Sequence, residues 1–369
     1  VLDPHDDWSN IGYWGDHQVV YLLRLMQWSR RFFPGQISRC LDQKMFVYAD
    51  VPYRIKPYRE LLLDPRDSIG YDTERDRELA ERAGVPAGVI NVVAGSSSDI
   101  GGELTSNPLV RKLTFTGSTP IGKMLEAQCA GTMKKTSMEL GGNAPFIVFD
   151  DADLDAAVAG AMISKYRNAG QTCVCSNRLF VQDGVHDAFV EKLVKATAAL
   201  VVGDGMKDGI TIGPLVNKKA VGDVDALVQA SVESGARVAL GGGPHAMGGC
   251  FYQPTVLTGV TSEMAVFRNE IFGPVAPVVR FSTEEEVIAM ANDTEFGLSG
   301  YFCARDIGRI WRVAEGLECG IIGINEGVIS NTMAPFGGMK ESGNGREGSK
   351  YGLDDYLEIK YLCIGGIDR

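Results

Sequence analysis

The stretch 144-APFIVFDDADLDAAVAGAM-162 holds a strand and a helix in succession, and it decides the fold class. Its first half is a continuous apolar run of strand length that ends in two aspartates. Asp153 is then a suitable N-cap for a helix. Apolar residues follow at helical spacing, namely Leu154, Val158, Ala161 and Met162. A buried strand followed by an amphipathic helix is the repeating unit of α/β proteins.

The same alternation continues along the chain from Leu79 onward. Short apolar runs predict further strands at 89–95, 112–118, 178–182, 236–240, 274–281, 298–304 and 320–325. Helical stretches are predicted between them, for example at 78–88, 186–200 and 283–292. Because such alternation forms βαβ units, we predict an α/β fold with largely parallel sheets buried on both faces.

The composition of the 369-residue chain favours an acidic protein that handles small molecules. Its formal net charge is −11 and its isoelectric point is about 5.0. Nucleic acids and anionic membranes bind basic patches, so we expect neither as a partner. We find no run of membrane-span length and no signal-peptide pattern in the first ten residues. The eight cysteines form no C-x-x-C pair, which predicts reduced thiols and a cytoplasmic location.

Residues 1–78 differ from the rest of the chain. They hold three of the four tryptophans and six of the 12 tyrosines, but only four of the 45 glycines. They show no sustained period of helix or strand.

Two glycine-rich stretches are candidates for phosphate binding. The pattern G-x-G-x-x-G occurs at Gly343, Gly345 and Gly348, but no predicted strand precedes it and no long helical pattern follows. We therefore interpret it as a glycine-rich loop. The stretch 115-FTGSTPIGKMLE-126 is the better candidate, because a strand ends there at a glycine turn and a helix begins. Backbone N–H groups would face an anion above that turn.

Histidine and metal chemistry find little support in the sequence. The four histidines lie in no recognisable nucleophile motif, which disfavours hydrolases of the Ser-His and Cys-His types. Cys173 and Cys175 lack further soft ligands at metal spacing, so we predict no metal site.

Cys173, in 168-NAGQTCVCSNR-178, is either a nucleophile or a packing residue. Free cysteine is often simply buried. Here the flanking residues are small and polar, as in a loop that exposes a side chain, and a helix leads in while a strand leads out. Glu139 precedes a glycine pair at a strand edge, which suits a general base.

Five blocks of sequence carry a family resemblance. They are 115-FTGS-118, 138-MELGGNAPFIVFDDADLDAA-157, 168-NAGQTCVC-175, 270-EIFGPVAP-277 and 335-PFGGMKESGNGREG-348. Together they resemble the NAD(P)-dependent aldehyde dehydrogenase family, and within it most closely the succinate-semialdehyde dehydrogenases. The resemblance covers about residues 79–366, with the blocks in the family's order and spacing.

The resemblance implies oxidation of succinate semialdehyde to succinate through a cysteine. Cys173 would attack the aldehyde carbon to give a thiohemiacetal, and hydride transfer would leave a thioester. Glu139 would activate the water that hydrolyses this thioester. Arg167 and Ser330 match positions that bind the substrate's distal carboxylate, for which a guanidinium has the right two-pronged geometry. Cys175 would form a strained, reversible disulfide with Cys173.

The resemblance also implies a set of residues that bind NAD or NADP. They are Gly117 and Ser118 at the pyrophosphate, Gly101 in the preceding loop, the backbone of Leu140 beside the nicotinamide, Glu270 at the nicotinamide ribose and Phe272 against the ring.

The domains implied by the resemblance begin after the unmatched, altered region 1–78. Residues 79–140 would be the remaining part of a Rossmann-type cofactor domain, incomplete by sequence, and 141–316 an α/β catalytic domain. Residues 317–369 would carry a small β arm for oligomerisation into a homodimer or homotetramer. The alternative is a catalytically impaired relative that serves as an assembly partner or a redox-sensing thiol protein.

Overall fold

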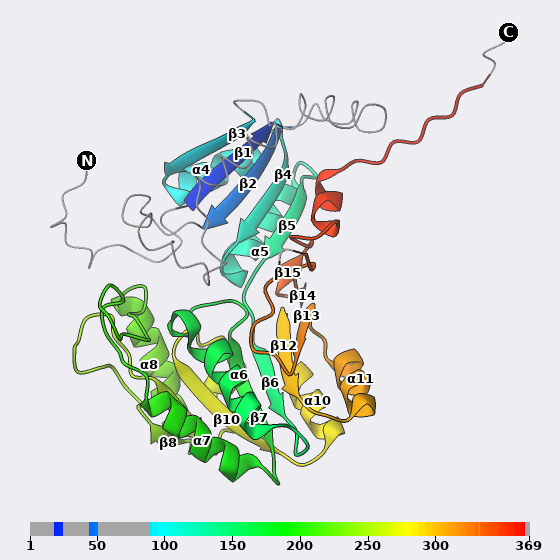
Figure 1. Cartoon of the computed structure of the whole chain (residues 1–369). Helices are drawn as coiled ribbons and strands as arrows, with labels where there is room; N and C mark the ends of the chain where they lie inside the picture. The colour runs from blue at the N-terminus through cyan, green and yellow to red at the C-terminus, as the bar shows by residue number, and fades with distance from the viewer. Residues whose placement is uncertain (1–17, 25–43, 51–88, 332, 366–369) are drawn as a thin grey trace. The chain divides into compact units, whose positions relative to one another are not determined.

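The computed structural model describes residues 18–24, 44–50, 89–331 and 333–365 (Figure 1). The chain divides into two compact units. Glu139–Asn344 forms the larger unit, and described residues of Trp14–Met138 and Gly345–Arg369 form the smaller unit. Within the described ranges, no helix is both long enough and apolar enough to cross a bilayer. The helix predicted at 78–88 lies outside the described residues.

The larger unit is built on a sheet whose described strands run in the order β13-β12-β6-β7-β10-β9-β8. They are β6 (Ala144–Val148), β7 (Ser176–Gln182), β8 (Arg237–Leu240), β9 (Thr255–Thr258), β10 (Val275–Phe281), β12 (Ser299–Cys303) and β13 (Ile321–Ile324). Neighbours are parallel except β8 and β9, which are antiparallel. The central strands are buried along almost their whole length, which confirms the predicted α/β class and largely parallel sheet.

The stretch that predicted the fold forms β6 and the helix α6 (Leu154–Tyr166). The Asp153 side chain accepts hydrogen bonds from the backbone N–H groups of Asp155 and Ala156, which caps the helix as predicted. Val158 and Ala161 are buried against the sheet. The apolar run and the cap therefore act as the sequence pattern indicates.

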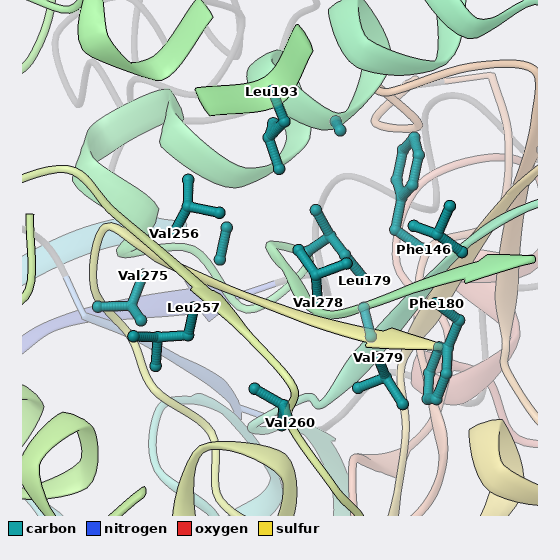
Figure 2. Close-up of a cluster of buried hydrophobic side chains, with 14 of the residues drawn as sticks. Phe146, Leu179, Phe180, Leu193, Val256, Leu257, Val260, Val275, Val278 and Val279 are labelled. Carbon is teal, nitrogen blue, oxygen red and sulfur yellow. The ribbon is translucent and has the colours of Figure 1, made fainter. Parts of the chain in front are cut away.

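The other helices of the larger unit cover the sheet. They are α7 (His186–Ala198), α8 (Lys218–Glu233), α9 (Ala265–Arg268), α10 (Glu284–Asn292) and α11 (Ile307–Gly316). Helices α6 and α7 pack side by side and contact β6, β7 and β9 (Figure 1). Figure 2 shows part of the core, including Phe146 on β6, Leu179 on β7 and Val278 on β10. The short strands β11 (Phe296–Gly297), β14 (Met339–Lys340) and β15 (Gly343–Asn344) complete this unit.

The smaller unit contains strands in the order β5-β4-β2-β1-β3. Their bounds are β1 (Gln18–Arg24), β2 (Lys44–Asp50), β3 (Ile90–Gly95), β4 (Val110–Thr116) and β5 (Lys135–Glu139), the last residue of which begins the larger unit. Strand β1 pairs antiparallel with both β2 and β3. Strands β1 and β2 are short apolar runs within the region 1–78, where the sequence shows no sustained period of helix or strand.

Helices α4 (Ser97–Ser106) and α5 (Thr119–Ala130) belong to this smaller unit, and they contact each other and β4. The short 3-10 helix η3 (Tyr351–Tyr356) is tied to the sheet by buried polar contacts. Lys112 Nζ donates to Ser137 Oγ at 2.5 Å, and Ser137 Oγ donates to Asp355 Oδ2 at 2.9 Å. Burial lowers the pKa of Lys112 to about 8.

The predicted loop begins with the short strand β15 at Gly343, and all three glycines, Gly343, Gly345 and Gly348, have positive φ. A Cβ at Gly345 would lie 2.5 Å from Asp355 Oδ2 and 2.8 Å from Ser137 Oγ. Close packing therefore requires glycine at position 345. No long helix follows the motif within the described residues, since the next element is the short 3-10 helix η3.

Candidate active site

Three segments of the larger unit lead into neighbouring strands at one edge of its sheet. Glu139 precedes β6, Cys173 precedes β7 and Glu270 precedes β10, and these three strands are adjacent and parallel. The amino ends of parallel strands meet at the same edge of a sheet. The candidate site therefore lies at the amino-terminal edge, opposite to the edge that open α/β sheets usually use.

Cys173 lies in a tight turn that other side chains hold in place. The Cys175 N–H donates to the Thr172 carbonyl at 3.0 Å, which closes the turn. Tyr301 Oη, from β12, donates to the Val174 carbonyl at 2.7 Å. The Cys173 residue as a whole is half-buried.

The segment that leads into this turn has a constrained backbone. Asn168 and Ala169 adopt φ values of 51° and 55°, in the left-handed region that non-glycine residues rarely occupy. Asn168 Nδ2 donates to the Gln171 carbonyl, and Gln171 Nε2 donates back to the Asn168 carbonyl. Gln171 Oε1 also accepts from the Val216 N–H at 2.8 Å. Strain held by reciprocal hydrogen bonds is typical of functional loops.

The loop after Glu139 runs directly against the cysteine turn. A Cβ at Gly142 would lie 2.5 Å from the Cys173 carbonyl oxygen, so only glycine allows this approach. The Gly142 N–H donates to Glu270 Oε1 at 3.0 Å. One glycine thus joins the backbone of the cysteine turn and the carboxylate of the third segment.

The Cys173 thiol is surrounded by groups that act on its charge. Burial raises its pKa to about 12, with smaller contributions from the negative charges of Glu270 and Glu139. The backbone N–H groups of Cys173 and Val174 oppose this shift by hydrogen bonding to the sulfur. The thiol is therefore protonated at neutral pH, and both predicted carboxylates lie within electrostatic range of it.

Glu270 is a second perturbed group in this cluster. Burial raises the pKa of its carboxyl to about 7, while the Gly142 N–H and the charge of Lys165 act in the opposite direction. Lys165 is completely buried, and in the described part of the chain its Nζ makes no hydrogen bond. Carboxyl groups that titrate near neutrality are common in sites that transfer protons.

The predicted substrate residues lie in the same unit. Arg167 is half-buried at the C-terminal end of α6, and within the described ranges it makes no ion pair. Ser330 is half-buried in the loop after β13. This loop packs on α6, since a Cβ at Gly327 would lie 2.6 Å from Ile163 Cγ2. Ile163 is one helical turn before Arg167, so the loop and the arginine share one face of α6.

Cys175 is buried beside this cluster. Its Sγ donates to the Lys165 carbonyl at 3.4 Å, and burial raises the pKa of its thiol. Both Cys173 and Cys175 are free thiols in the structure.

The predicted cofactor residues are distributed over both units. In the larger unit, Leu140 is buried and its N–H donates to the Ser342 carbonyl at 3.0 Å. Phe272 has a φ of 50° and exposes 39% of its surface. In the smaller unit, Gly117 and Ser118 form the predicted turn between β4 and α5.

The prediction that Gly101 lies in a loop is wrong, because it lies inside α4. The serines before it form the start of that helix, and Ser96 accepts from the Asp99 N–H as the N-cap. The sequence signal for a helix start was therefore present, since serine followed by an acidic residue in the first turn is typical of one.

Four residues that organise the site were not predicted from the sequence: Asn143, Asn177, Arg178 and Ser342. All are 3% exposed or less. Ser342 Oγ donates to the Gly141 carbonyl and accepts from the Gly297 N–H. The available signal was the presence of polar side chains inside or beside strands that read as buried. Among the described residues, no group of three or more His, Cys, Asp or Glu side chains is arranged to hold a metal.

Comparison with known proteins identifies the family. The model of the aldehyde dehydrogenase family matches residues 75–362. A glutarate-semialdehyde dehydrogenase of Pseudomonas aeruginosa is 63% identical over 83% of this chain and 64% of its own length. A succinate-semialdehyde dehydrogenase [NADP(+)] of Escherichia coli is 61% identical over 83% of this chain and 63% of its own length.

A solved structure gives the same result. The succinate-semialdehyde dehydrogenase of Burkholderia pseudomallei superposes with a TM-score of 0.76 at 59% identity, covering 79% of this chain and 61% of that protein. The chain spans less than two thirds of the length of each of these relatives. The family model matches more than half of the chain, and these relatives are 59 to 63% identical over the matched regions. The chain therefore belongs to the aldehyde dehydrogenase family.

Proposed function

We propose that the chain oxidises an aldehyde that carries a distal carboxylate, with NAD or NADP as the hydride acceptor. The observation that carries this proposal is the Cys173 thiol on a constrained turn, with the carboxylates of Glu139 and Glu270 close enough to act on its charge. A nucleophilic sulfur beside a carboxylate base is the arrangement that thioester chemistry requires.

The proposed chemistry is divided among these side chains. The Cys173 sulfur bonds to the aldehyde carbon, its proton passes to a neighbouring carboxylate, and the Cys173 N–H stabilises the oxyanion. When bound, the nicotinamide accepts the hydride. Cys173 then carries a thioester. Glu139 takes a proton from water, which attacks the thioester carbon, breaks the carbon–sulfur bond and releases the acid.

Each unit, taken by itself, carries features that suit part of a dinucleotide. The turn at Gly117 and Ser118 leads into α5, whose first turn has no acidic side chain to repel a pyrophosphate. The Glu270 carboxylate can accept hydrogen bonds from ribose hydroxyls, and Phe272 offers an exposed ring. We propose these roles, with Gly101 near the pyrophosphate and the Leu140 backbone beside the nicotinamide.

The proposed substrate is succinate semialdehyde, recognised by Arg167 and Ser330. The relatives named above act on succinate or glutarate semialdehyde, which differ by one methylene and share an aldehyde with a distal carboxylate. Gly327 packs against Ile163 of α6, which brings the loop that carries Ser330 to the helix that ends at Arg167. This packing supports a shared role of Arg167 and Ser330 in binding the substrate. One methylene typically changes kcat/KM by about 10 to 200-fold.

Replacing Arg167 with glutamine is expected to raise KM for succinate semialdehyde by about 10 to 100-fold. The change removes a charge-assisted hydrogen bond to the substrate carboxylate. An uncharged aldehyde such as butanal serves as the control and should show almost the same KM with both proteins. Steady-state kinetics with the two aldehydes would contradict the assignment if both KM values rose equally.

The C-terminal segment supports assembly into a homo-oligomer. Ile359, Tyr361, Leu362 and Ile364 are strongly exposed after η3. The predicted strand is wrong within the described residues, because 357–365 form no strand in the isolated chain. An exposed apolar segment can still gain strand pairing from another chain, and we infer that it joins subunits as a dimer or tetramer. Sedimentation of the full chain is expected to give an assembly larger than a monomer. Deletion of residues 357–369 should reduce its size, and an unchanged assembly would contradict this inference.

The proposed function is tested by the absorbance of reduced nicotinamide. We expect it to grow when the full chain meets succinate semialdehyde with NAD or with NADP, and to grow more slowly with glutarate semialdehyde. No growth with either cofactor would contradict the proposal and favour an impaired assembly partner or redox-sensing thiol protein. Inactivation by peroxide that dithiothreitol reverses would support a Cys173–Cys175 disulfide.

A further inference from the structure

The segment around Glu270 is held by a buried asparagine from a neighbouring strand. Asn177, the second residue of β7, is 3% exposed. Its Nδ2 donates to the Asn269 carbonyl at 2.8 Å, and its Oδ1 accepts from the Ile271 N–H at 3.1 Å. One side-chain amide thus binds the backbone on both sides of Glu270, as a paired strand would.

A second asparagine completes this contact. Asn177 Nδ2 also donates to Asn143 Oδ1 at 2.7 Å. Asn143 Nδ2 donates to the Phe267 carbonyl at 3.0 Å, which holds the same segment four residues before Ile271. Both hydrogens of the Asn177 amide are therefore used, and a residue with one polar atom cannot replace all of these bonds.

The two asparagines also connect the segment to the loop that orients the carboxylate. Asn143 follows Gly142, whose N–H donates to Glu270 Oε1. The backbone of Glu270 is fixed through Asn177, and its carboxylate is fixed through the residue next to Asn143. This closed ring of contacts leaves the Glu270 carboxylate little freedom to move relative to the Cys173 turn.

We propose that Asn177 is the positioning residue that sets where the Glu270 carboxylate lies relative to the Cys173 thiol. Packing alone gives no reason for an amide here, because an apolar side chain would fill a buried strand position without needing partners. The Asn177 amide has a use here because it holds the Asn269 carbonyl and the Ile271 N–H, one on each side of Glu270. The catalytic consequence rests on the function proposed above, since Glu270 is there the ligand of the nicotinamide ribose.

A change in the position of the Glu270 carboxylate can be measured through its effect on the Cys173 thiol. Glu270 and Glu139 face Cys173, while Lys165 faces Glu270 and, with Arg167, faces Cys175. Glu270 disfavours the Cys173 thiolate. If the carboxylate moves away, the thiolate becomes easier to form and the sulfur reacts faster at a given pH.

The experiment is the rate of alkylation of Cys173 by iodoacetamide as a function of pH. Cys173 and Cys175 lie in one tryptic peptide, residues 168–178, and fragmentation between them separates the two labels. We expect Glu270→Gln to move the profile to lower pH by about one unit, which is about tenfold in rate below the pKa. Asn177→Ala should move it in the same direction.

The double variant Asn177→Ala/Glu270→Gln decides between positioning and packing. If Asn177 acts through Glu270, the double variant should match Glu270→Gln, because the charge that Asn177 holds in place is already gone. Additive shifts, or no shift in Asn177→Ala, would overturn the proposal. Ser176→Ala is the matched control, since Ser176 is buried on the same strand and its hydroxyl makes no hydrogen bond within the described residues. Asn177→Ser provides a milder variant should the alanine variant fail to fold.

Kinetics of the same variants separate this inference from the proposed function. In an active chain, Asn177→Ala should raise KM for the cofactor about tenfold, with a smaller change in KM for the aldehyde. Equal changes in both would overturn the link to the cofactor. A wild-type chain that oxidises no aldehyde would refute the proposed function, while the alkylation profiles would still decide whether Asn177 positions Glu270.

Discussion

Replacing Cys173 with serine is expected to lower kcat for aldehyde oxidation by a thousandfold or more, and replacing it with alanine to abolish the activity. Sulfur forms the bond to the substrate and later leaves as a thiolate, and a serine hydroxyl does both far less readily. The measurement is the growth of reduced nicotinamide with succinate semialdehyde, at enzyme concentrations high enough to detect slow turnover.

Cys250→Ser is the matched control for this prediction. Cys250 is also a half-buried free thiol of the larger unit, but it lies in the loop before β9, which carries none of the residues assigned to the chemistry. We expect it to keep nearly the wild-type rate. Wild-type activity in Cys173→Ser, or an equal loss in both variants, would contradict the assignment of the nucleophile.

Replacing Arg178 with leucine is expected to destabilise the larger unit by about 3 to 5 kcal/mol. The guanidinium is completely buried. It donates twice to the Asn143 carbonyl, at 2.7 and 3.1 Å, and also to the carbonyls of Met290 and Ala291 at the end of α10. Leucine would leave these three carbonyls buried without donors. Arg178→Lys should also destabilise, because one ammonium cannot span the same acceptors.

Urea unfolding measures this effect, with Arg280→Ala as the control. Arg280 is exposed on β10 and pairs with Asp183 and Asp187, so its loss should cost about 1 kcal/mol or less. A change in Arg178→Leu as small as in the control would show that the buried guanidinium contributes little to the fold. Because Arg178 binds the Asn143 carbonyl, we also expect lower activity in the Arg178 variants that remain folded.

Local signals in the sequence were sufficient for the elements that carry the site. An apolar run followed by an aspartate cap predicted β6 and α6, because burial and capping act over a few residues. The small polar flanks of Cys173 likewise predicted a loop before β7, where the structure has a tight, half-buried turn. The family resemblance implied a loop at Gly101, whereas Ser96 caps a helix that contains Gly101.

The contacts that position the site could not be predicted in this way. Asn177 reaches Asn269 across 92 positions of sequence, and Arg178 reaches Ala291 across 113. Such pairs form only when the sheet brings β7 beside β10, and no periodicity in either segment encodes the partner. Polar residues in a strand that reads as buried nevertheless require partners, so they mark positions where long-range contacts should be expected.

The most direct test of the proposed mechanism is to trap its covalent intermediate. Glu139→Gln removes the carboxylate that activates water, while Cys173 and the cofactor residues remain. With succinate semialdehyde and the active cofactor, the account predicts one equivalent of reduced nicotinamide per site and a succinyl thioester on Cys173, found by mass spectrometry of peptide 168–178. Continued turnover without acylation of Cys173, or a label on another residue, would contradict it.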